Sequence, residues 1–282
     1  MTGFSKHSVG DIEVIVLEDG HSRAPNSLFP LHDMEKARAA AAQAGDTYDG
    51  ETAYVPINAF VIRAGDTVAI VDAGSPPDYL PTTGGFPNAL AAAGVAPDEV
   101  THLIMTHLHV DHVGGMVDAA GNAVFANAEL VSGQGEWDHF QNDDFMGKLG
   151  KRALASFMSS RRAITPYADR RRDISGETEV VPGISMIPLP GHTPGHSGVH
   201  ITDGDQQLLI WGDTIHSETF QMAEPDWGVL FDVDGDQARA TRKRIFDRVA
   251  SDGLTVTGPH VRGPGFCQVE RMKQGYRLVR DT

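Results

Sequence analysis

The sequence predicts a layered α/β protein with mixed sheets. Short apolar runs rich in β-branched residues recur along the chain, and the Gly, Asp and Pro residues that flank them are typical of strand ends. Helical patterns lie between these runs, and one of them carries a clear apolar stripe. Because the strands occur in clusters with helices between them, we expect helices on the outside of packed sheets.

The expected strands are about four to seven residues long, which favours strands over helix segments. Two connections are typical of hairpins, since Ala-Gly-Asp at 64–66 and Asp-Gly-Asp at 203–205 place turn residues between neighbouring runs. The strands should therefore pair mostly antiparallel. They cover residues 12–17, 59–63, 67–72, 103–106, 184–189, 198–202 and 208–211.

Helices are expected at 33–44, 87–93, 147–160 and 236–250. In the last of these, Asp236 is a plausible N-cap. The apolar stripe on this charged segment consists of Ala238, Ile245, Phe246 and Val249.

The whole chain, residues 1–282, is expected to form a single domain, because its length suits one large core and no repeat or low-complexity linker divides it. Residues 1–55 are interpreted as an N-terminal extension that wraps the core or reaches a partner subunit. Residues 140–178 carry many charges and weak strand signals, so they are interpreted as helices and loops inserted beside the site.

Charge and composition exclude several classes of partner. A net charge of −15 argues against nucleic acids and anionic membranes, because such a surface repels phosphates. The single cysteine, Cys267, allows no intrachain disulfide. No segment approaches the roughly 20 apolar residues of a membrane span, and the first residues lack a secretory pattern, so a cytoplasmic location is expected.

The strongest motif is THLHVDHVGG at 106–115, directly after an expected strand. Imidazole and carboxylate groups suit zinc and similar cations, and the absence of thiolates argues against a structural zinc knuckle. The alternative is a chance cluster of surface histidines, but these would repel one another on protonation. The candidate ligands are His107, His109, Asp111 and His112.

Three later segments supply further candidates. LPGHTPGHSG at 189–198 presents His192 as a ligand, while His196 is expected to support a ligand or the core. Asp213 follows the strand 208–211 and could bridge two cations with its two oxygens, although a helix or turn cap is the alternative. His260, in TVTGPHVRGPG, is the weakest candidate taken alone.

The ordered set HxHxDH, GH, GD and a late His resembles the metallo-β-lactamase superfamily, from about residue 56 to 260. This resemblance implies a four-layer αβ/βα sandwich with mixed sheets and metals at one sheet edge. It implies that Asp213 bridges the metals and that Asp72, in the VDAG segment 71–74, supports a ligand or the adjacent turn. The implied first metal binds His107, His109 and His192, and the second binds Asp111, His112 and His260.

Longer segments are similar to the branch of methyl parathion hydrolase and related lactonases. These are PGHTPGHSGVHI, LLIWGDTIH, FDVDGDQARATRKRIFDRVASDG and GPGFCQVERMKQGYRLV. The resemblance implies a homodimer and an apolar pocket beside the metals. By local matching, the residues expected near that pocket are Tyr79, Trp137, Phe140, His216 and Phe220.

The expected function is hydrolysis of lactones or other esters with apolar groups, with a metal-bridging hydroxide as nucleophile. Phosphotriesterase activity is a further expectation. Asp111 and Asp213 are the expected catalytic residues. Zinc is the expected metal, and manganese, iron and cobalt also fit such ligands. The alternatives are a glyoxalase II-like thioesterase, which would need a basic cluster near the C-terminus that is not identifiable, and a non-catalytic metal-binding member acting through oligomerisation. Asp213 argues against a true β-lactamase.

Overall fold

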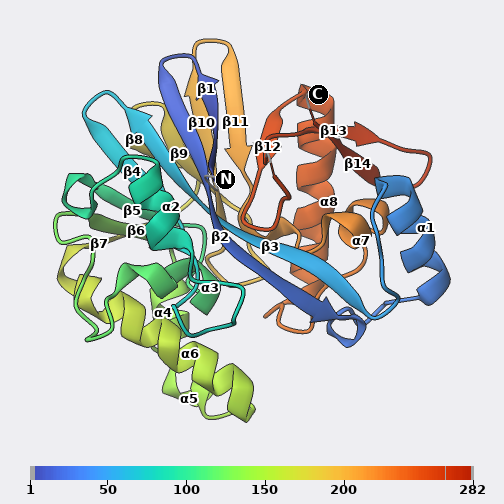
Figure 1. Ribbon diagram of the computed structural model, residues 1–282, viewed down its shortest axis with the longest axis horizontal. Helices are drawn as coiled ribbons and strands as arrows, with labels where there is room; N and C mark the ends of the chain where they lie inside the picture. Colours follow the sequence, from blue (N-terminus) through green and yellow to red (C-terminus); the bar gives the residue numbers. More distant parts are fainter. Residues whose placement is uncertain (1–3, 264, 281–282) are drawn as a thin grey trace.

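The structure is a computed structural model that describes residues 4–263 and 265–280 (Figure 1). The two ends of the predicted domain, residues 1–3 and 281–282, lie outside the described residues. Residue 264, in the GPGF segment used for the branch resemblance, does so as well.

The first seven strands form one sheet, in which they lie side by side in chain order from β1 to β7. The first four pair antiparallel, and β4 to β7 pair parallel. The strands are β1 (Phe4–Val9), β2 (Ile12–Pro25), β3 (Thr52–Ala64), β4 (Thr67–Val71), β5 (His102–Met105), β6 (Glu129–Gly133) and β7 (Arg171–Ile174).

A five-stranded sheet has the order β12-β11-β10-β9-β8 and is antiparallel except for the parallel pair β11 and β12. Both predicted hairpins are confirmed, as β3–β4 and as β10–β11. The strands are β8 (Thr178–Val181), β9 (Ile184–Pro188), β10 (Ser197–Asp203), β11 (Gln206–Ile210) and β12 (Thr255–Thr257), and a separate pair is formed by β13 (Gln268–Arg271) and β14 (Tyr276–Val279).

Three apolar clusters define four layers. Between the sheets, Phe60 and Ile104 pack in one cluster with Val199 and Ile210. Helices α2 (Phe86–Ala92), α3 (Val110–Val113) and α6 (Lys151–Ile164) lie on the outer side of the seven-stranded sheet, and α8 (Gly235–Asp252) covers the five-stranded sheet (Figure 1). The predicted αβ/βα sandwich is therefore confirmed.

Two helix predictions needed correction. The N-cap of α8 is Asp234, whose carboxylate accepts the N–H of Gln237 at 2.9 Å, whereas Asp236 lies inside the first turn. The helix expected at 147–160 begins later, at Lys151, because Gly147 ends the short α5 (Asp143–Met146) and Gly150 is the N-cap of α6.

Residues 1–55 were expected to form an extension, but they include β1 and β2, which are strands of the seven-stranded sheet. Strand β2 continues past Gly20 through an irregularity in its pairing with β3, so it reaches Pro25. The segment around α1 (Met34–Ala44) packs against α7 (Glu218–Ala223) and lies beside the sandwich (Figure 1). The region 140–178 contains α5 and α6 as expected, and also the edge strand β7, which its charged sequence concealed.

None of the described helices combines the length and the apolar character needed to cross a membrane.

Candidate metal centre

The predicted ligands follow the ends of strands from both sheets. His107 follows β5, His192 follows β9, Asp213 follows β11 and His260 follows β12. The parallel pairing of β11 with β12 brings the last two loops to the same edge, because parallel strands end on the same side of a sheet. The stacked sheets thus bring segments more than 150 positions apart into one cluster.

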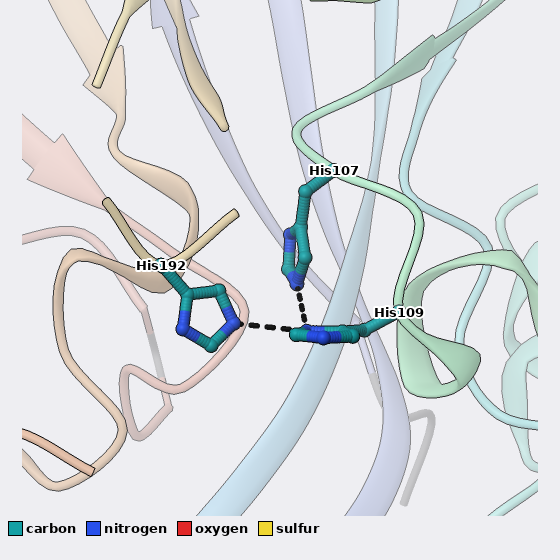
Figure 2. A group of neighbouring side chains, drawn as sticks. All are labelled: His107, His109 and His192. Atoms are coloured by element: carbon teal, nitrogen blue, oxygen red, sulfur yellow. Dashed lines mark hydrogen bonds between the residues drawn. The ribbon is translucent and has the colours of Figure 1, made fainter. Parts of the chain in front are cut away.

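The first group consists of His107, His109 and His192, which come from two loops and point toward one another (Figure 2). His109 Nδ1 lies 2.9 Å from His107 Nε2 and 2.9 Å from His192 Nε2. Three imidazole nitrogens therefore converge on one small volume, an arrangement that suits a borderline cation such as zinc.

The second group consists of Asp111, His112 and His260. Asp213 lies between the groups. Its Oδ1 is 3.4 Å from His112 Nε2, and its Oδ2 is 3.2 Å from His260 Nε2 and 3.5 Å from His192 Nε2. His216 Nε2 also lies 3.0 Å from Asp213 Oδ2. One carboxylate thus contacts members of both groups, as a bridging ligand must.

Several ligand rings are held through the ring nitrogen that faces away from the cluster. His260 Nδ1 lies 2.6 Å from the carbonyl oxygen of Pro56, and His112 Nδ1 lies 2.9 Å from Asp72 Oδ2. Since a carbonyl or carboxylate oxygen can only accept, Nδ1 carries the proton in both rings. Nε2 is therefore the atom of each ring that faces the cluster, and it would ligate a metal ion on losing its proton.

Asp72 contacts both a candidate ligand and the start of the ligand loop. Its Oδ1 accepts the backbone N–H of Thr106 at 2.9 Å, so it fixes the start of the ligand loop as well as His112. Asp72 is fully buried and has a φ of 56°, the left-handed region that non-glycine residues seldom adopt outside functional sites. His196 likewise accepts the N–H of Asp213, at 2.8 Å, and therefore fixes the bridging residue.

The electrostatics of the cluster favour the neutral forms of His107 and His109. Burial holds the pKa of His107 and of His109 well below the ordinary value. Burial also lowers the pKa of His112, but the carboxylates of Asp213 and Asp72 outweigh burial and raise that pKa well above the ordinary value. Burial raises the pKa of Asp213, whereas the surrounding histidines, His112 first, hold it well below its usual range.

The donor set fits divalent metal ions. Within residues 4–263 and 265–280, the buried atoms His112 Nε2 and Asp213 Oδ1 have no hydrogen-bond partner, although an orphaned buried polar group is costly. The candidate ligands form four overlapping groups of three residues, and within each group the ligand atoms lie within 4.8 Å of one another. Nitrogen atoms dominate these groups, which suits zinc. All seven predicted ligands belong to these groups, and His216 joins His192 and Asp213 in the fourth.

Two of the predicted pocket residues lie beside the ligands. The ring of Phe140, in α4 (Glu136–Phe140), meets that of His109 edge to face at 5.7 Å. Burial, together with the charge of nearby Asp111, raises the pKa of Tyr79 to about 12. Tyr79 and Phe140 therefore contribute to the surroundings of both groups.

Two other predicted pocket aromatics have packing contacts elsewhere. Trp137 packs against the core beneath the seven-stranded sheet, and the Arg171 guanidinium lies over its ring at 4.4 Å. Phe220 is fully buried in a separate aromatic cluster, where it meets Phe29 at 5.3 Å and Trp227 at 5.5 Å. The structure thus gives both residues the ordinary role of core packing.

Two residues near the site were missed by the sequence analysis. Asp232 Oδ1 lies 2.8 Å from His192 Nδ1 and so holds that ligand from behind. The neighbouring Phe231 is 42% exposed, and its ring lies 5.0 Å from that of His216 and 5.8 Å from that of His192. Their segment, FDVDGD, is typical of a loop before a helix, and nothing in its composition indicates a partner 40 positions earlier.

Comparison with known families and proteins gives consistent results. A model of the metallo-β-lactamase superfamily matches residues 53–260. An N-acyl homoserine lactonase of a Bacillus species is 25% identical over 224 residues, which cover 72% of this chain and 80% of that protein. The N-acyl homoserine lactonase AiiA of Bacillus thuringiensis subsp. kurstaki is 27% identical, but the match spans only 58% of this chain and 57% of AiiA.

Solved structures share the whole fold. The hydrolase AbOPH, described as a member of the β-lactamase superfamily, superposes with a TM-score of 0.91 at 25% identity over 100% of this chain and 98% of its own. AidC, described as a dizinc quorum-quenching lactonase in complex with a product, superposes with a TM-score of 0.91 at 24% identity over 99% and 98%.

Proposed function

The chain belongs to the metallo-β-lactamase superfamily, and from this premise we propose that it is a dinuclear metal-dependent hydrolase of lactones and related esters with apolar groups. The observation that carries the proposal is the position of Asp213, which contacts His112 and His260 of the second group and His192 of the first. The names of the similar lactonases support the choice of lactones.

The proposed ligands follow the two groups. His107, His109 and His192 would hold one ion, Asp111, His112 and His260 the other, and Asp213 both. Zinc is the proposed metal, because imidazole nitrogens dominate the set and the structurally similar AidC is described as a dizinc enzyme. When bound, such a pair of ions would acidify water to supply a hydroxide nucleophile and would polarise the ester carbonyl.

The chain's own part in the reaction begins with orientation. Asp72 holds His112, Asp232 holds His192, and His196 holds the backbone of Asp213. With these contacts in place, the ligand atoms need not reorganise when substrate arrives, which lowers the barrier to reaction.

His216 is the residue we propose to orient the ester group. Its side chain is 6% exposed, and burial lowers its pKa to about 4, so the ring is neutral near pH 7. A neutral imidazole carries one N–H, which can donate to a carbonyl or alcohol oxygen of the substrate. His216 Nε2 lies 3.0 Å from Asp213 Oδ2. With that oxygen engaged by a metal ion, the N–H of His216 would be free to donate to the ester.

Phe231 supplies an apolar surface beside the same atoms. Its exposed ring lies against His192 and His216, so an apolar acyl group could bury surface against it while the ester lies over the ligands. Tyr79, whose pKa is raised in part by the charge of Asp111, would border the substrate near that carboxylate.

The test is turnover by zinc-loaded protein on a panel of N-acyl homoserine lactones, aryl esters, phosphotriesters and a glutathione thioester. We expect lactone hydrolysis that is lost in the Asp213→Ala variant. A protein that holds two equivalents of zinc but hydrolyses no oxygen ester would contradict the proposal, and turnover of the thioester alone would favour the thioesterase alternative. Phosphotriesterase activity and a homodimer stay predictions, to be checked by the same panel and by light scattering.

A further inference from the structure

A buried carboxylate lies between the two loops that supply the first group of histidines. Glu136 is the first residue of α4 and is fully buried, although it is not one of the predicted ligands. The residue before it, Gly135, has a φ of 93°, a backbone conformation that favours glycine, and this turn directs the helix start toward the loops.

Glu136 accepts a backbone hydrogen bond from each loop. Its Oε2 accepts the backbone N–H of Leu108 at 3.0 Å, and its Oε1 accepts the backbone N–H of Gly195 at 2.8 Å. Leu108 lies between His107 and His109, and Gly195 follows His192 by three positions. A single side chain therefore ties together the two segments that carry these histidines.

The backbone around Glu136 leaves little room for adjustment. A Cβ atom on Gly195 would lie 2.6 Å from the carbonyl oxygen of Gln134 and 2.9 Å from Glu136 Cγ. A Cβ atom on Gly133 would lie 1.9 Å from the carbonyl oxygen of Gly195. The segment that precedes Glu136 thus packs backbone against backbone with the loop that carries Gly195, so the place of Glu136 relative to that loop is closely fixed.

No ordinary charge partner explains this burial. Among the described residues, Glu136 forms no ion pair with lysine, arginine or histidine within 4.0 Å. A buried carboxylate without an ion pair is costly, so its retention calls for a compensating role. Two charge-assisted hydrogen bonds to backbone N–H groups are what it provides here.

We propose that Glu136 is a positioning residue that sets the spacing of His107 and His109 relative to His192, and thereby the affinity of this group for its metal ion. The second group, Asp111, His112 and His260, has no such contact to Glu136 and should be unaffected. The inference rests on the proposed function in that it takes the histidines as metal ligands, but it concerns ion affinity and not turnover.

The experiment measures zinc affinity in proteins with one intact group. His260→Ala disables the second group, and His109→Ala disables the first. Glu136→Gln keeps the size of the side chain but replaces one acceptor oxygen by an NH₂ donor, so one of the two backbone N–H groups loses its partner. We expect Glu136→Gln to weaken zinc binding about 10- to 100-fold in the His260→Ala background, the usual effect of losing a supporting contact. In the His109→Ala background we expect less than about a threefold change, since that group lacks the contact.

Asp19→Asn is the matched control. Asp19 is also a buried carboxylate that accepts backbone N–H groups, but its donors are Ser75, Gly84 and Phe86, which belong to neither of the two loops that Glu136 joins. We expect this variant to lose stability without weakening the first ion. Equal weakening of zinc binding by Asp19→Asn and Glu136→Gln, or equal weakening in both backgrounds, would overturn the proposal.

A second measurement needs no variant. In the metal-free native protein, the amide protons of Leu108 and Gly195 should exchange slowly, because Glu136 accepts both. Exchange at the rate of an unstructured peptide would overturn the proposal. The two hypotheses fail separately: a protein that binds two ions without hydrolysing any ester overturns the function alone, whereas unchanged zinc affinity in Glu136→Gln overturns only this inference.

Discussion

The ligand cluster differs in burial from the rim beside it, which is formed by Phe231 and Leu230. In the cluster, His107 and His112 are fully buried, and rings such as His112 are held by a second contact behind the ligand atom. On the rim, Phe231 is 42% exposed and its neighbour Leu230 is 63% exposed. The difference teaches that the chain fixes the atoms that would hold metal and leaves apolar side chains exposed beside them.

The largest effect should come from the centre of the cluster. Asp213→Ala removes the contact shared by both groups, so kcat/KM for lactones should fall by more than about 100-fold and zinc content should drop below two equivalents. Elemental analysis with steady-state kinetics measures both. Asp205→Ala, in the turn 203–205, is the control and should behave as the parent does. Full zinc content with normal kinetics in Asp213→Ala would show that the cluster does not depend on Asp213.

A supporting contact behind the cluster should have the next largest effect. Asp232→Ala removes the carboxylate that holds His192 Nδ1, so zinc affinity should weaken about 10- to 100-fold, because an unsupported ring binds metal less well. Competition with a chelator measures the affinity. Asp236→Ala, whose carboxylate is exposed on α8, should bind zinc as the parent does; matching affinities in the two variants would show that Asp232 does not support the ligand.

The rim should change selectivity and not metal binding. Phe231→Ala removes an apolar surface beside His192 and His216, so KM for lactones with long acyl chains should rise about 10-fold, equivalent to about 1.4 kcal/mol, with zinc content unchanged. Kinetics across a series of acyl lengths measures this. Leu230→Ala should change KM less than about twofold, and a loss of zinc in Phe231→Ala would mean that the rim belongs to the cluster.

Phe220 should have the smallest effect on kinetics. Its ring packs with Phe29 and Trp227 in a separate cluster, so Phe220→Ala should lower the free energy of unfolding by about 3–5 kcal/mol. The KM of the folded variant should stay that of the parent. Chemical denaturation and kinetics at low temperature test this. A raised KM with unchanged stability would show that Phe220 lies near the substrate pocket, as the sequence predicts.

The same contrast explains what could be predicted from the sequence. The candidate ligands His107 and Asp213 could be identified from the sequence, because a few residue types at strand ends have a specific chemistry. Asp232 was not, since its contact to His192 depends on how a loop before α8 folds back. Trp137 and Phe220 show that an aromatic residue near a motif does not reveal which side of its element faces the site.

The fold was predicted in its layers but less well in its boundaries. Apolar alternation and turn residues identified both hairpins, whereas the Asp-Gly pair at 19–20 resembles a turn and concealed the second half of β2. There, the carbonyl oxygen of Thr82 lies so close to Gly20 that only glycine fits, so the strand bends and continues. The charged strand β7 at the sheet edge carried too little apolar signal to be predicted.

The origin of the ligands from both sheets has a consequence for assembly. His107 to His112 come from the first half of the sandwich, and His192, Asp213 and His260 from the second, so neither half holds a full set. An ion bound here would contact residues of both halves, so metal binding would stabilise their association. Two separately expressed fragments, divided at the turn between β7 and β8, should then associate more tightly when zinc is added.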